Sequence, residues 1–99
     1  MNDLQRLYLL RDLIRQSQLS SARSLVAFAS QIESLVSSID DIPDTFRRVY
    51  SEFWEALEVL GVQHQESCTE PTVVELADLK AMSIDFELEV SKSIVARED

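Results

Sequence analysis

The strongest structural signal in the chain is a two-sided pattern between Thr45 and Leu60. Apolar side chains recur there at intervals of three and four residues, as on one face of an α-helix, while polar and charged side chains fill the opposite face. Arg48 and Glu52 are spaced for an i,i+4 ion pair, and Gly61, the only glycine, predicts the end of the helix. The apolar face comprises Phe46, Val49, Tyr50, Phe53, Ala56, Leu57 and Leu60. Other elements have to cover this face.

Three further segments have helical patterns. Residues 3–16 are apolar around most of the helix, because Leu9 and Leu13 lie opposite the main stripe, and residues 22–38 have one wide apolar stripe. The segment 73–95 begins with a Thr72–Glu75 capping box and has two apolar stripes. One stripe consists of Val74, Ala77, Ala81, Ile84, Leu88 and Val95, and the other of Leu76, Leu79, Phe86, Val90 and Ile94. We therefore predict an all-α fold, a compact four-helix bundle-like single domain over residues 1–99.

Two segments leave room for another structure. Residues 84–90 alternate strictly between apolar and acidic, which is the period of a half-buried strand, and 72–76 could pair with them in a short β-hairpin near the C-terminus. We favour the helix, because residues 77–82 are good helix formers. Residues 62–70 are polar and aperiodic, so we expect a loop there that carries His64 and Cys68.

Charge is the main guide to function. The chain has 18 acidic and 9 basic residues and a formal net charge of −9. Residues 1–32 carry a net charge of +2 (four Arg, two Asp), so residues 33–99 carry −11. This balance disfavours direct binding to nucleic acid or an anionic membrane and favours a basic protein partner. The alternative is that the acidity serves solubility alone.

Catalytic and metal-binding signatures are absent from the sequence. His64 and Cys68 have no further His or Cys with which to complete a zinc site, and one glycine cannot build a phosphate-binding loop. We therefore expect no enzymatic activity, no metal and no cofactor. A single cysteine cannot form an internal disulfide, and the charged N-terminal segment resembles neither a signal peptide nor a membrane span. These features predict a cytoplasmic protein.

Two groups of carboxylates are candidates for binding the partner. In the last predicted helix the acidic residues fall on a shared strip that spans about 21 Å at a rise of 1.5 Å per residue. In the central helix the acidic residues surround a tryptophan that we expect either to anchor an interface or to close the core. The candidate residues are Glu75, Asp78, Asp85 and Glu89 on the strip, and Glu52, Glu55, Glu58 and Trp54 on the central helix.

The first third of the chain resembles a known family. Residues 10–14 read Leu-Arg-Asp-Leu-Ile, residues 18–21 read Gln-Leu-Ser-Ser, and Phe28 follows. This order is similar to the opening of small helical bacterial immunity proteins, particularly the colicin D-type group that neutralises ribonuclease toxins. Beyond Val36 no motif of that family has a counterpart. The resemblance implies an acidic helical bundle that occupies a basic nuclease cleft.

Two functions from different classes follow from these patterns. The first is an acidic inhibitor that binds a basic nucleic-acid-handling protein, as a toxin immunity protein or a nucleic-acid mimic such as an anti-CRISPR protein. The second is a helical chaperone, assembly adaptor or homodimeric module that uses surplus apolar faces, for which we expect Leu9, Leu13, Phe86 and Val90 to form the docking surface.

Overall fold

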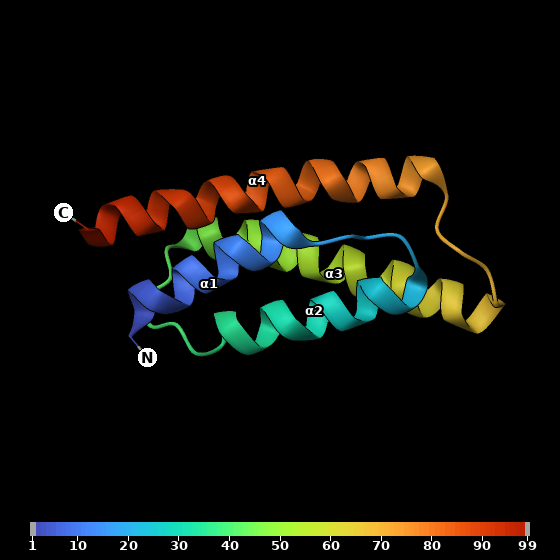
Figure 1. Cartoon of the computed structure of the whole chain (residues 1–99), viewed down its shortest axis with the longest axis horizontal. Coiled ribbons are helices and arrows are strands. Elements are labelled where there is room, and N and C mark those ends of the chain that lie inside the picture. The colour runs from blue at the N-terminus through green and yellow to red at the C-terminus, as the bar shows by residue number, and fades with distance from the viewer. Residues whose placement is uncertain (1, 99) are drawn as a thin grey trace.

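The chain folds into four α-helices that alternate in direction (Figure 1). The structure is a computed structural model that describes residues 2–98. The helices are α1 (Asp3–Gln16), α2 (Ala22–Val36), α3 (Asp44–Ser67) and α4 (Val73–Glu98). α1 contacts α2 and α4, and α3 also contacts α2 and α4, so the four helices form a closed ring. The predicted all-α four-helix bundle is confirmed. The hairpin alternative is wrong, because residues 84–90 lie inside α4.

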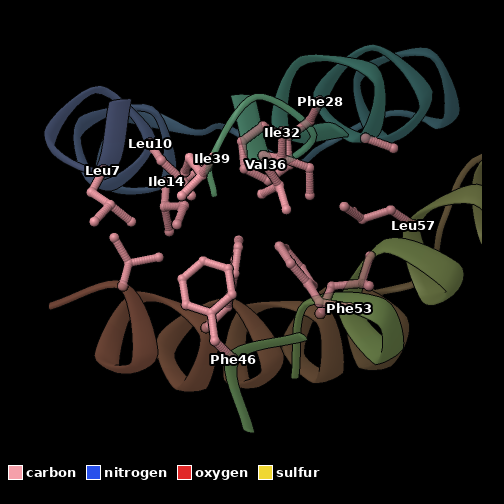
Figure 2. Packing of buried hydrophobic residues seen from close by; sticks show 14 of the residues in the cluster. Leu7, Leu10, Ile14, Phe28, Ile32, Val36, Ile39, Phe46, Phe53 and Leu57 are labelled. Carbon is pink, nitrogen blue, oxygen red and sulfur yellow. The ribbon is translucent and has the colours of Figure 1, made fainter. Parts of the chain in front are cut away.

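The core forms where the apolar face of α3 meets the other three helices. Phe46, Phe53 and Phe86 are at most 1% exposed, and the ring centroids of Phe46 and Phe53 lie 5.4 and 5.9 Å from that of Phe86. Figure 2 shows side chains of α1 and α2 pointing into the same interior from the opposite side, among them Leu7 and Ile32. Each such side chain contributes about 1.5–3 kcal/mol through burial. The central helix thus organises the bundle.

Local capping explains where α1, α2 and α4 begin, whereas α3 starts after Pro43 without a side-chain cap. α1 and α2 start with reciprocal capping boxes, in which Asn2 pairs with Gln5 and Ser21 with Ser24. The predicted box of α4 is confirmed, since the Thr72 N–H donates to Glu75 Oε1 at 2.9 Å and the Glu75 N–H donates to Thr72 Oγ1 at 3.1 Å. These contacts span only three residues, so they can be recognised in a sequence.

The predicted end of the central helix at Gly61 is wrong. α3 continues to Ser67, and Gly61 is buried within it where α3 crosses α2. A Cβ atom at this position would lie 2.6 Å from Val26 Cγ2 and 3.3 Å from the Ala22 carbonyl oxygen. The residue therefore permits a close approach of two helices. The helix ends after Ser67 instead, and the capping residue Cys68 takes a left-handed conformation with φ 54°.

α1 is much shorter than α4 and lies along only part of it. α1 has 14 residues and α4 has 26, and α1 lies along the C-terminal half of α4 (Figure 1). The Arg15 side chain contacts Glu87 Oε1 at 2.7 Å, and the Arg97 side chain reaches Asp3. α2 ends at Val36, two residues before the predicted end at Ser38. Because the four helices alternate in direction, both termini lie at the same end of the bundle (Figure 1).

Candidate functional site

The acidic strip predicted on the last helix lies on the side of α4 that faces α3. Glu75 Oε1 is 2.8 Å from His64 Nε2 of α3, whereas Glu87 contacts Arg15 of α1 on the other side. Because successive residues are rotated by about 100°, Asp78 lies on the same side as Glu75. Asp85 and Glu89 belong to this side by the same geometry.

The four carboxylates of the strip differ in what they already bind. Glu75 accepts hydrogen bonds from the Thr72 N–H and contacts the His64 ring, and these two contacts, the Thr72 N–H first, lower the pKa of its carboxyl. Glu89 lies 3.5 Å from the Lys92 ammonium. Asp78 and Asp85 are exposed and make no ion pair among the described residues. These two are therefore the free carboxylates of the strip.

Glu52 of α3 lies beside this strip. Two contacts fix the register between the antiparallel helices α3 and α4: His64 lies opposite Glu75, and Phe53 lies opposite Phe86. Each helix advances by eleven residues between these contacts, so Glu52 lies at the height of residue 87 on α4. Glu52 is also nine residues from Gly61, which puts it on the opposite side of the helix from the contact with α2. We call the surface formed by Glu52, Asp78, Asp85 and Glu89 the acidic α3–α4 face.

The other predicted residues of α3 lie elsewhere. Glu55 is exposed and points away from the bundle, and Glu58 lies on the α2 side, because it is within one turn of Gly61. Trp54 is half-buried on that same side and packs against the core, and its indole N–H is buried without a hydrogen-bond partner among residues 2–98. The structure therefore does not gather the eight predicted residues into one surface.

His64 does not lie in a loop, contrary to the sequence-based expectation. It belongs to the last turns of α3, where Nδ1 is 2.7 Å from Thr69 Oγ1 and Nε2 is 2.8 Å from Glu75 Oε1. The imidazole thus joins the end of α3, the connection and the start of α4. The sequence does not reveal this contact, because His64 and Glu75 are eleven residues apart on different helices and no short-range pattern links them. Cys68 is exposed at the helix end.

An apolar stripe of α4 remains uncovered beside the acidic face. Ile84, Leu88 and Val95 are 57%, 54% and 58% exposed, and Val74 is 70% exposed. We call Val74, Ala77, Ala81, Ile84, Leu88 and Val95 the outer stripe of α4. Phe86 and Val90 belong to the buried stripe and are 0% exposed, so the expectation that they form a docking surface is wrong.

The first helix leaves a smaller apolar surface. Leu9 is 44% exposed, as expected for the surplus face of α1, while Leu13 is half-buried against the core.

Comparisons with known proteins identify no relative. Neither a scan of protein-family models nor searches of curated proteins and solved structures found a match. Among the described residues, no helix is long and apolar enough to cross a membrane, and no group of three or more His, Cys, Asp or Glu side chains is arranged to hold a metal ion. The resemblance to colicin D-type immunity proteins stays a prediction.

Proposed function

We propose that the protein is a non-enzymatic acidic inhibitor of a basic nucleic-acid-handling protein, acting as a toxin immunity protein or as a nucleic-acid mimic such as an anti-CRISPR protein. The observation that carries the proposal is the acidic α3–α4 face, whose carboxylates at Asp78 and Asp85 are exposed and without ion pairs among the described residues. They are seven residues apart, or about 10 Å along the helix, comparable to about three nucleotides of one DNA strand.

Exposed carboxylates act mainly on the rate and selectivity of association. An exposed ion pair contributes only about 0.2–1 kcal/mol, but a surface of one sign accelerates encounter with an oppositely charged partner. The formal charge of −11 on residues 33–99 supports such steering, because it includes both helices that form the acidic face. Binding is therefore expected to weaken and to slow as ionic strength rises.

The test compares two charge-reversal variants that have the same change in net charge. One carries Glu52→Lys, Asp78→Lys and Asp85→Lys on the acidic face, and the control carries three exposed reversals on other surfaces, at Asp12, Glu33 and Asp40. Tagged protein is used to capture partners from a lysate of its own source, and bound proteins are released stepwise with salt. We expect the native protein and the control to retain a basic nucleic-acid-handling protein up to moderate salt, and the first variant to lose it.

Equal capture by the two variants would contradict the proposal. Far-UV circular dichroism of both variants checks that each remains helical. Glu75 is left unchanged in this design because its contacts with His64 and Thr72 belong to the fold.

A second candidate function is a helical adaptor or homodimeric module. The outer stripe of α4 favours it, since four of its side chains are at least 54% exposed. Capture through this stripe alone would persist at high salt, because apolar burial does not weaken with ionic strength.

A further inference from the structure

The outer stripe of α4 has the spacing of a coiled-coil seam. Its residues follow one another at intervals of three, four, three and four from Val74 to Leu88, and Ser91 and Val95 continue the same order. α1 and α3 cover the other side of α4, and no described residue covers this seam along its length. The helix thus presents a surface on which another helix can pack.

We infer that this seam binds an amphipathic helix of the partner whose basic side chains face α3. This inference rests on the proposed function, and it adds the partner's structural element and its orientation. In the heptad, Asp78 and Asp85 occupy the flank beside α3, where partner side chains reach across. The opposite flank holds Lys80 and Glu87, and Arg15 already pairs with Glu87. Only the α3 flank therefore offers free negative charge.

The charge asymmetry specifies what the partner helix should look like. Two Lys or Arg seven residues apart on one flank would meet Asp78 and Asp85, and Glu52 lies at the height of residue 87, between Asp85 and Glu89. The other flank needs no net charge. Bulky residues of the partner helix would lie opposite Ala77 and Ala81, whose side chains are small and exposed, and smaller ones opposite Ile84 and Leu88.

A second copy of this chain fits the seam less well. In an antiparallel twofold contact the α3 flank of one copy would face that of the other. Asp78, Asp85 and Glu89 of both copies would then come together, with Lys92 as the one cation on this flank among the described residues. In a parallel contact the α3 flank would face the flank of Lys80 and Glu87, which carries no net charge. Each copy also carries a formal charge of −9. A basic helix avoids this repulsion.

A synthetic helix tests the inference without knowledge of the natural partner. The probe is a fluorescent three-heptad peptide with leucine at the seam positions and arginine on one flank, and the control probe has the same composition in scrambled order. Fluorescence anisotropy with the full chain measures both affinities at low and at moderate salt. We expect the ordered probe to bind at least about tenfold more tightly than the scrambled one.

Variants of exposed residues then locate the site. Ile84→Ser with Leu88→Ser should weaken binding of the ordered probe by about tenfold or more, and Asp78→Asn with Asp85→Asn should reduce its salt dependence. Leu9→Ser, which changes an exposed leucine of α1 of similar exposure, is the matched control and should leave the affinity unchanged.

Three results would overturn the inference. The first is equal binding of the ordered and scrambled probes, and the second is binding of the ordered probe that is unaffected by the changes at Ile84 and Leu88. The third is a dimer in light scattering that those two changes dissociate, since a second copy would then occupy the seam. In the capture experiment, loss of the natural partner on charge reversal but not on the Ile84 and Leu88 changes refutes this inference alone. Retention on charge reversal refutes the proposed function.

Discussion

Replacement of Gly61 by alanine tests the close contact between α2 and α3. In a helix interior, alanine is more favourable than glycine by about 0.5–1 kcal/mol. Here the new methyl group would lie 2.6 Å from Val26 Cγ2 and 3.3 Å from the Ala22 carbonyl oxygen. Val26 is β-branched and strongly prefers one rotamer in a helix, so it cannot easily turn away.

The expected magnitude follows from these opposing effects. Overpacking a buried position costs about 1–3 kcal/mol, which exceeds the helix-propensity gain. We therefore expect Gly61→Ala to lower the free energy of unfolding by about 1–2 kcal/mol and the Tm by about 5–15 °C. Urea unfolding followed by far-UV circular dichroism measures the first quantity, and a thermal scan measures the second.

A double-mutant cycle with Val26→Ala separates this explanation from the alternative. In the Val26→Ala background the nearest atom is gone, so Gly61→Ala should be close to neutral or slightly stabilising, with a coupling of about 1–2 kcal/mol. If Gly61 were instead needed for a left-handed helix end, its replacement by alanine would lower the free energy of unfolding equally in both backgrounds. Equal losses in the two backgrounds would refute the reasoning.

Three further changes probe the core and two titrating groups. Phe86→Ala should cost about 3–5 kcal/mol because the ring is fully buried, while Leu88→Ala, 54% exposed, should cost under about 1 kcal/mol in urea unfolding. The pKa of the Glu75 carboxyl is lower in the folded protein than its unfolded value of 4.5. The ionised carboxylate therefore stabilises the fold above pH 4.5, and this stability is lost as the pH falls through the folded pKa. Glu75→Gln should make the free energy of unfolding depend less on pH in the acid range. Burial, together with Glu33, raises the pKa of Tyr50 to about 12 from 10.0. The Tyr50 phenol therefore ionises first in the unfolded chain, and the free energy of unfolding should fall as the pH rises between these two values. In an ultraviolet titration of the folded protein the Tyr50 phenolate should form near the higher value.

Each of these has an outcome that contradicts its basis. Equal losses for Phe86→Ala and Leu88→Ala would mean that the two stripes of α4 are not buried and exposed as described. An unchanged acid limb in Glu75→Gln would show that the contacts of Glu75 with the Thr72 N–H and with His64 do not survive in solution. Ionisation of Tyr50 near 10.0 would exclude its burial.

Much of the architecture could be predicted from the sequence because the start of a helix depends mainly on residues close to one another in the sequence. The Thr72–Glu75 box involves two side chains and two N–H groups within one turn, so the pattern is visible without a fold. The acidic strip is likewise a matter of helical rotation, and the structure places Asp78 and Asp85 on one side of α4 as expected. Four helices and their order followed from such local patterns.

The end of α3 and the role of the surface residues could not be predicted in this way. The backbone freedom of glycine predicts that a helix ends at Gly61. In the structure Gly61 lies inside α3, and what matters is that it has no side chain to clash with the neighbouring α2. Glu75 and Asp78 look alike in the sequence, yet His64 reaches only Glu75. Both errors arise from contacts between residues on different helices or far apart in the chain.

The sequence by itself determined that the chain forms amphipathic helices, that its charge is concentrated after residue 32, and that two apolar stripes run along the last helix. Only the tertiary structure decided which stripe is buried. Both stripes are apolar and have helical spacing, but Phe86 fits between Phe46 and Phe53, and that packing turns the outer stripe and the acidic flank towards solvent. Burial is a property of how helices pack together, so local sequence could not choose between the two.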